Sequence, residues 1–251
     1  MIRHILRVKI KLTAFLLSLL FLLITALSVV SVTRTISSDG DDIETFIRNS
    51  NGKYWDVTET NLQAAIDDLT TGGSVWLPNC NITITSSIEL EDSINLIGMG
   101  KNSTLYLSNG ANQDLIQIKG KQNILIEKIH LDINGNQQTS YDIKGIDITG
   151  SSRDITIRGC YLARGSASLI DIQEGAEYVI VEDCFFDGRK KQNYGGAIWI
   201  SGFHCIIKNN IIRDTYACGI VMEAATLDPS AKWNIIDGNE ITGEISHGIH
   251  M

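Results

Sequence analysis

The stretch Gly145–Gly150, GIDITG, decides the fold, because five other pieces of the chain share its pattern. In each piece an isoleucine is followed by one variable residue and then by another isoleucine or a methionine. The first isoleucines of the six pieces are Ile116, Ile146, Ile170, Ile198, Ile220 and Ile249. They are separated by 30, 24, 28, 22 and 29 residues. Alternation with a period of two residues predicts strands, and irregular spacing in this range is typical of a solenoid.

A second strand-like segment follows each of the first five pieces. These segments are ILIEKIHLD, ITIRGCYLA, VIVEDCFFD, CIIKNNIIRD and IIDGNEITG. No helical pattern separates the strands, and a propeller would need more strands in each unit. We therefore predict an all-β fold in residues 73–251, a right-handed parallel β-helix in which each coil covers the hydrophobic side of the next.

Side chains at equivalent inward positions should stack from coil to coil. One such column contains Ile118, Ile148, Ile172, Ile200, Met222 and Met251. A second column contains Ile129, Cys160, Cys184, Asn210 and Asn239. Asn210 over Asn239 predicts an asparagine ladder at a turn. Cys160 over Cys184 predicts either a pair of buried thiols or a strained disulfide, because adjacent strands lie about 4.8 Å apart.

Residues 45–72 differ from the coils that follow. FIRNSNGKYWDV predicts a hairpin around its Asn-Gly pair. TETNLQAAIDDL predicts a short amphipathic helix, with Thr60 as the N-cap and Gln63 at the capping-box position. Because a solenoid needs its open end covered, we expect this helix to cap the first coil.

Residues 1–32 form a separate unit. Four basic residues and no acidic ones precede the uncharged segment Leu12–Val32. This pattern is typical either of a signal peptide, cleaved before Val29, or of an N-terminal membrane anchor. A buried core helix is the third alternative. The first two alternatives place the chain beyond the polar linker 33–44 outside the cytoplasm, either secreted or anchored at the cell surface.

The net charge argues against one class of partner, and the cysteine spacing argues against two kinds of structural site. The formal net charge of −8 would become −12 without the leader, which holds four basic and no acidic residues. Such a charge argues against nucleic acid, although an acidic glycan could bind if a cation bridged the like charges. The five cysteines show no spacing typical of a disulfide framework, and neither a CxxC pair nor a histidine cluster predicts zinc.

The segment Asn61–Leu107 resembles the N-terminal part of the pectate-lyase-like, or pectin lyase-like, superfamily. It carries GGSVWLP at Gly72–Pro78 and LIGMG at Leu96–Gly100, and residues 115–251 resemble the generic repeats of that superfamily. The resemblance implies a β-helix that binds polysaccharides. It does not imply one reaction, because the superfamily includes lyases, hydrolases, epimerases and non-catalytic proteins. The sequence lacks the motifs that identify particular enzymes of this superfamily. These motifs are Gly-His-Gly, paired Asn-x-Asp and Asp-Asp, and Arg-x-Pro-x-x-Arg.

The residue after each aligned isoleucine should point outward. These residues form a column that we call the outer stripe: Gln117, Asp147, Asp171, Trp199, Val221 and His250. Five steps of about 4.8 Å make this column more than ~20 Å long, enough for several sugar residues. In the resembling enzymes this face carries the substrate groove, so we take Gln117 and Trp199 as candidate substrate-binding residues.

Asp147 and Asp171 should lie on adjacent strands. Two carboxylates this close cannot both ionise freely. They predict either a catalytic acid–base pair or a Ca²⁺ site with both residues as metal ligands, and two solvated aspartates are the plain alternative. Ca²⁺ is the one cofactor that this reading suggests.

Trp199 either stacks on a sugar ring or is covered by the preceding loop, DGRKKQNYGG. That loop adds Arg189 and Lys190 as candidate catalytic cations for a uronate and Tyr194 as a candidate substrate-binding residue, unless the loop is merely solvated. His250 is a candidate catalytic base.

The final residues, SHGIHM, have the pattern of the first strand of another coil. We therefore expect either a chain truncated at its C-terminus or a partner stacked on the open end. Two functions fit the sequence. One is an exported lyase, hydrolase or epimerase that acts on an extracellular, uronate-containing polysaccharide. The other is a non-catalytic surface protein, either an adhesin or a glycan-binding scaffold. The missing signatures favour the scaffold, whereas the two aspartates beside Trp199 favour the enzyme.

Overall fold

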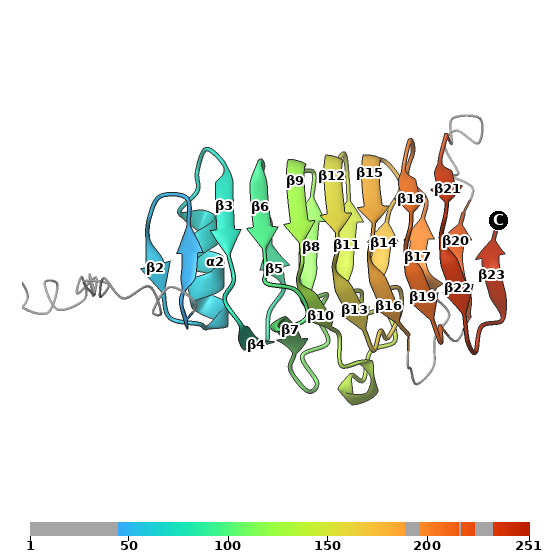
Figure 1. The fold of residues 1–251 in the computed structure, drawn as a ribbon, viewed down its shortest axis with the longest axis horizontal. Helices are drawn as coiled ribbons and strands as arrows, with labels where there is room; N and C mark the ends of the chain where they lie inside the picture. The colour runs from blue at the N-terminus through green and yellow to red at the C-terminus, as the bar shows by residue number, and fades with distance from the viewer. Residues whose placement is uncertain (1–44, 189–195, 216, 224–232) are drawn as a thin grey trace, which may run out of the picture. The chain divides into compact units, whose positions relative to one another are not determined.

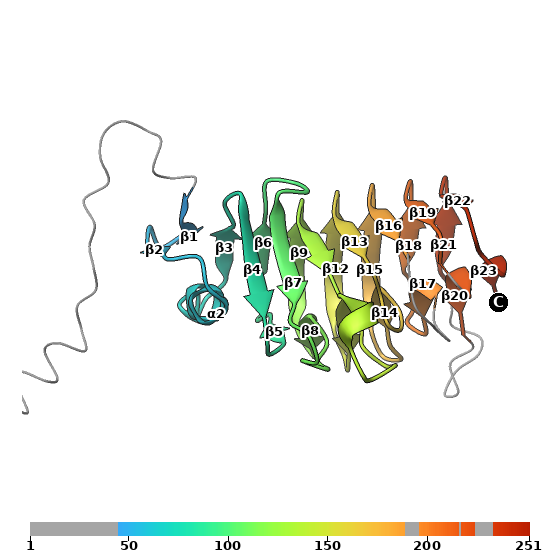
Figure 2. The ribbon, with the colours of Figure 1, turned by 90° about the horizontal axis from the view of Figure 1, so that it is seen from below.

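The computed structural model describes residues 45–188, 196–215, 217–223 and 233–251. These residues wind into successive coils, and each full coil gives one strand to each of three sheets (Figure 1; Figure 2). The prediction of a parallel β-helix is therefore confirmed. No helix within the described ranges is long and apolar enough to span a membrane. The predicted leader 1–32 and linker 33–44 lie outside these ranges.

The three sheets are named here in the order in which the chain enters them. Sheet A contains β2 (Tyr54–Trp55), β1 (Ile47–Asn49), β3 (Gly73–Trp76), β6 (Ile94–Ile97), β9 (Gln122–Glu127), β12 (Arg153–Arg158), β15 (Glu177–Glu182), β18 (Ile206–Lys208) and β21 (Ile235–Asp237). Sheet B contains β4 (Cys80–Ile84), β7 (Ser103–Leu107), β10 (His130–Asp132), β13 (Tyr161–Ala163), β16 (Phe185–Asp187), β19 (Ile211–Arg213) and β22 (Glu240–Thr242). Sheet C contains β5 (Ile88–Glu89), β8 (Ile116–Lys119), β11 (Ile146–Thr149), β14 (Ile170–Ile172), β17 (Gly196–Ile200), β20 (Cys218–Met222) and β23 (His247–His250). A short 3-10 helix, η2 (Gly135–Gln137), follows β10.

The core is a set of aliphatic columns inside the coils. In sheet C, Ile148 pairs in register with Ile118 on one side and Ile172 on the other, and all three are fully buried. Ile200 continues this column. Each isoleucine therefore packs on the isoleucines of the neighbouring coils. In this way the short strands together form one continuous hydrophobic core. Met251 departs from the prediction, because it lies beyond the last paired strand of the described chain and is 85% exposed.

The corner between sheets A and B repeats one backbone conformation in five successive coils. Strands β9, β12, β15, β18 and β21 each end before a residue with a left-handed backbone, and the side chain after that residue turns inward. The left-handed residues are Lys128, Gly159, Asp183, Asn209 and Gly238. The side chain of Asn210 donates to Asn239 Oδ1 at 2.9 Å and accepts the backbone N–H of Cys184 at 2.9 Å. The asparagine ladder is confirmed, and Cys160 and Cys184 are free buried thiols.

The chain before the first coil forms a hairpin and a helix. Strands β1 and β2 pair antiparallel, as the Asn-Gly turn predicts. Helix α2 (Glu59–Asp67) buries Leu62, Ala65 and Ile66 in the same core. The N-cap is Thr58 and not Thr60: Thr58 has an extended backbone, and its hydroxyl accepts the N–H of Asn61 at 3.2 Å.

Gln63 also differs from its predicted role. Instead of completing a capping box, its side chain accepts the backbone N–H of Glu89 at 3.0 Å and donates to the carbonyl of Glu89 at 3.1 Å. This pair of bonds ties α2 to the start of sheet C. The sequence could not show it, because Glu89 lies 26 residues away.

Replacing Thr58 by alanine should lower the free energy of unfolding by about 1 kcal/mol, because Asn61 N–H loses its cap. Replacing Thr60 by alanine is the matched control. It should be neutral or slightly stabilising, since Thr60 is exposed within the first turn and alanine favours helix. Urea unfolding followed by circular dichroism measures both. Equal losses for the two variants would contradict the assignment of the cap.

Candidate functional site

The outer stripe forms a continuous column across sheet C. Asp147 pairs in register with Gln117 on one side and Asp171 on the other. Asp171 then pairs with Trp199, Trp199 with Val221, and Val221 with His250. The predicted register is therefore confirmed over six strands. Glu89 extends the column by one further strand, because it pairs with Gln117. Its Ile-Glu alternation in β5 is the signal that could have identified it.

The two aspartates of the outer stripe lie in surroundings that raise the pKa of both carboxyl groups. Burial, and next the negative charge of Asp147, raise the pKa of Asp171 to about 7. Burial and the charge of Asp114 also raise the pKa of Asp147, whose carboxylate accepts a hydrogen bond from Gln173 at 2.7 Å. Asp147 is only 8% exposed. Asp147 is therefore not a freely solvated aspartate, and Asp171 is half-buried.

Lys144 places a positive charge beside this pair. Burial alone would lower its pKa, but the carboxylates of Asp114 and Asp147 raise it above the ordinary value. The backbone N–H of Lys144 donates to Asp114 at 2.8 Å, and its ammonium group pairs with Asp142 at 3.2 Å. The side chain of Lys144 is 13% exposed, so this is a partly buried cation. No sequence pattern indicates Lys144, because it lies on the loop before β11.

The Trp199 side chain is held at its edge by a carboxylate. Its indole N–H donates to Glu223 at 3.2 Å across one coil. Trp199 also pairs in register with Asp171, so a flat apolar side chain of the kind that can stack on a sugar lies one strand from this carboxyl group. The predicted residues Arg189, Lys190 and Tyr194 lie outside the described residues.

A second polar cluster lies on sheet B, and no sequence pattern indicated it. Arg164 donates to both carboxylate oxygens of Asp132, and the Tyr161 hydroxyl donates to Asp187 at 3.0 Å. The rings of His130 and Tyr161 meet edge to face at 4.7 Å, and burial lowers the pKa of His130. The Arg164–Asp132 and Tyr161–Asp187 bonds link neighbouring coils, whereas His130 Nε2 is buried without a hydrogen-bond partner among the described residues.

A family model described as "Right handed beta helix region" matches residues 101–251. The chain belongs to the right-handed β-helix family. This match confirms the suspected pectate-lyase-like superfamily at the level of the fold. No curated protein sequence matches the chain.

The solved structures that are similar to this chain include several proteins named for polysaccharide chemistry. The A-module of the mannuronan C-5 epimerase AlgE6 from Azotobacter vinelandii is 18% identical, with a TM-score of 0.61 over 76% of this chain and 53% of that module. The chain thus spans about half the length of that module. An alginate lyase from Paenibacillus is 18% identical, with a TM-score of 0.42 over 78% of this chain and 98% of the lyase. The catalytic domain of a GH87 α-1,3-glucanase in complex with nigerose is 13% identical, with a TM-score of 0.43 over 71% of this chain and 43% of that one. The likeness to the epimerase module, at 18% identity, shows a shared fold and nothing finer.

Proposed function

We propose that this protein is an exported polysaccharide-modifying enzyme that transfers protons at a uronate sugar along the outer stripe of sheet C. The observation that carries the proposal is the Asp147–Asp171 pair beside Lys144 and Trp199. Perturbed carboxylates beside a cation and a flat aromatic surface are typical of a functional site rather than of a structural ion pair. The names of the epimerase and lyase with the same fold suggest uronates as the first substrates to try.

The pKa of about 7 suits Asp171 to general acid–base catalysis. A group that is half protonated near neutral pH can both take and return a proton at the sugar ring. Lys144 supplies the positive charge that would offset a substrate carboxylate or a developing oxyanion. Trp199 would hold the ring of an adjacent sugar. Asp171 therefore acts as the general base, Lys144 stabilises negative charge on the substrate, and Trp199 binds a sugar ring.

Calcium fits this site poorly. A protein-bound Ca²⁺ takes six to eight oxygen ligands, and it favours ionised carboxylates. Burial raises the pKa of both aspartates, and Lys144 already places a positive charge beside them. Among the described residues no group of three or more metal-ligating side chains includes either aspartate. Calcium therefore has no role in the proposed reaction.

The test is incubation of the protein with mannuronan, alginate and polygalacturonate in D₂O. Deuterium at C5 would report proton abstraction with return of a proton, and unsaturated ends would report elimination. We expect one of these products from the natural chain and a loss of roughly 10²–10⁴-fold in Asp171→Asn. Asp154→Asn is the matched control, because Asp154 is an exposed aspartate on sheet A, away from the outer stripe.

Two results would overturn the proposal. One is equal turnover in the natural chain and Asp171→Asn. The other is binding of these polysaccharides without turnover in the natural chain, which would favour the glycan-binding scaffold. Export rests on the basic and apolar pattern of residues 1–32, and the N-terminal sequence of protein recovered from the medium or the membrane of its host tests it.

A further inference from the structure

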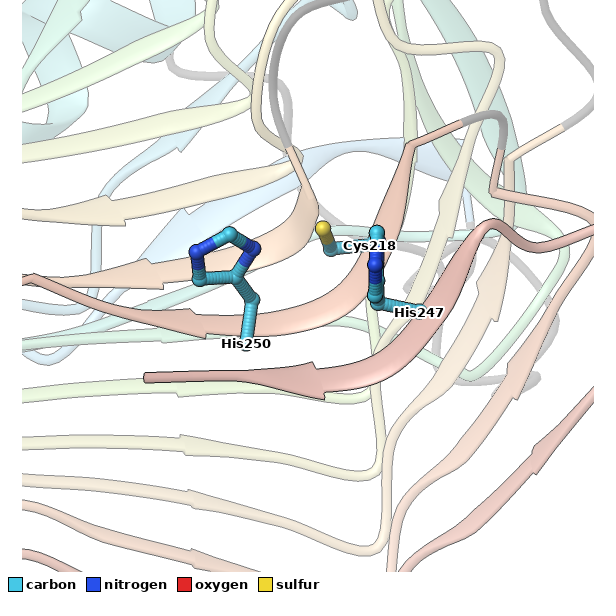
Figure 3. A group of neighbouring side chains, drawn as sticks. All are labelled: Cys218, His247 and His250. Atoms are coloured by element: carbon cyan, nitrogen blue, oxygen red, sulfur yellow. The ribbon is translucent and has the colours of Figure 1, made fainter.

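Three side chains that are separate in the sequence meet where β20 and β23 pair. Cys218 begins β20 and lies in register with His247, which begins β23. His250 follows three residues later on the same strand. One ligand atom from each of the three residues lies within 4.8 Å of the other two (Figure 3). The described chain offers no other group of three such side chains this close together.

The backbone of the two strands makes this arrangement possible. Residues three apart on a regular strand point to opposite faces. The rings of His247 and His250 are nevertheless only 5.5 Å apart and meet edge to face, so both lean toward the sulfur of Cys218 (Figure 3). A Cβ atom on Gly219 would lie 2.6 Å from the carbonyl oxygen of Gly248. Glycine at position 219 therefore lets the two strands approach closely beside the cluster.

The chemistry of the three donors selects one class of ligand. A thiolate and two imidazoles are the ligands that Zn²⁺ and similar borderline-soft transition metals prefer, whereas Ca²⁺ and Mg²⁺ prefer oxygen. Zinc holds such ligands about 2.0–2.3 Å away, so the ligand atoms of one site lie roughly 3–4 Å apart. Both histidines are exposed and can rotate to close the remaining difference, while Cys218 is 7% exposed and anchors the site.

We propose that Cys218, His247 and His250 form a transition-metal site, for which Zn²⁺ is the natural occupant. The protein supplies three ligands, which leaves the fourth tetrahedral position to water or to an oxygen of another molecule. His250 then binds metal instead of acting as the catalytic base that its place in the outer stripe suggested. The site does not depend on the proposed function, because neither Asp147 nor Asp171 belongs to it.

The test is titration of the purified full-length chain with Co²⁺, followed by displacement with Zn²⁺. Tetrahedral cobalt bound to a thiolate has intense visible bands and a near-ultraviolet charge-transfer band that histidine alone does not produce. We expect both to appear and saturate at one ion per chain, to vanish when Zn²⁺ is added, and to persist when Ca²⁺ is added in excess. Cys218→Ser should abolish the charge-transfer band, and His247→Gln and His250→Gln should each weaken Zn²⁺ binding.

Loss of an outer-shell partner already costs about 10–100-fold in metal affinity, so loss of a ligand should cost at least ~100-fold. Cys80→Ser and His204→Gln are matched controls, since they remove a cysteine and a histidine outside the cluster. Both should keep the cobalt spectrum and the zinc affinity of the natural chain. Absence of the thiolate band in the natural chain would overturn the proposal. An unchanged zinc affinity in Cys218→Ser would overturn it as well. Because Cys218→Ser is nearly isosteric and both histidines are exposed, circular dichroism should show all three variants folded.

Discussion

Asp171→Asn should be more stable than the natural chain above neutral pH, by about 1–3 kcal/mol. The pKa of Asp171 rises from an ordinary 3.8 to about 7 on folding, because burial and the charge of Asp147 disfavour its ionised form. A shift of that size corresponds to at most about 4 kcal/mol at 1.36 kcal/mol for each pKa unit, and local relaxation reduces it. Asparagine has nearly the same shape and no charge to bury, so the variant escapes this cost.

The stability difference between the natural chain and Asp171→Asn should depend on pH. Between pH of about 4 and 7 the folded chain holds a proton on Asp171 that the unfolded chain has released. The free energy of unfolding of the natural chain should therefore fall as the pH rises through this window, and it should level off above it. Asp171→Asn should lose that part of the slope, and the two chains should converge near the lower end of the window.

Urea unfolding at several pH values measures the difference between the two chains. Asp154→Asn again serves as the control, because it removes an exposed carboxylate and should leave the slope in place. A variant that gains stability while it loses turnover would show that Asp171 is retained for function at the expense of stability. If Asp171→Asn were as stable as the natural chain, or less so, at alkaline pH, the buried charge pair would not exist as described.

Asn210→Ala should lower the free energy of unfolding by about 2–5 kcal/mol. Asn210 is fully buried, donates to the carbonyl of Val181 at 2.9 Å and accepts the N–H of Cys184 at 2.9 Å. Alanine leaves both backbone groups without these partners, at about 1–3 kcal/mol for each buried polar group. The ladder also links three consecutive coils, since Asn210 donates to Asn239. Its loss therefore weakens both neighbouring junctions.

Cys184→Ala is the matched control for this prediction. It truncates the side chain at the same ladder position one coil earlier, where the thiol makes only weak bonds, at 3.6 Å to the carbonyl of Ile157 and at 3.2 Å to the carbonyl of Glu182. We expect it to cost about 1 kcal/mol, because it removes one buried sulfur and no strong hydrogen bond. Thermal and urea unfolding measure both variants. A loss for Asn210→Ala no larger than for Cys184→Ala would show that the asparagine amide is not what holds this corner.

The fold could be predicted because the deciding signals are local and repeated. Ile148 over Ile172 follows from a two-residue alternation that recurs at each coil, and a slip of one residue would turn every isoleucine outward. The outer stripe follows from the same register. The N-cap was misplaced by two residues, because Thr58 and Thr60 are chemically equivalent and only the tertiary contacts of α2 distinguish them.

The site could be predicted only in part. The sequence placed Asp147 next to Asp171. It did not identify Lys144 as the cation beside them or Glu223 as the partner of Trp199, since both are positioned by turns rather than by alternation. The cluster of Cys218, His247 and His250 also escaped, because no motif spacing joins residues from consecutive coils.

The sequence by itself therefore determined the coil, the register and the residues of the outer stripe, because these depend on a pattern that each coil repeats. Only the tertiary structure decided the chemistry of those residues. The pKa of Asp171 depends on how much water reaches it and on the charge one strand away. The ligand set of Cys218 depends on a neighbouring strand that enters the sheet one coil later. Burial and through-space distance are properties of the packed coils, and no stretch of the chain carries them alone.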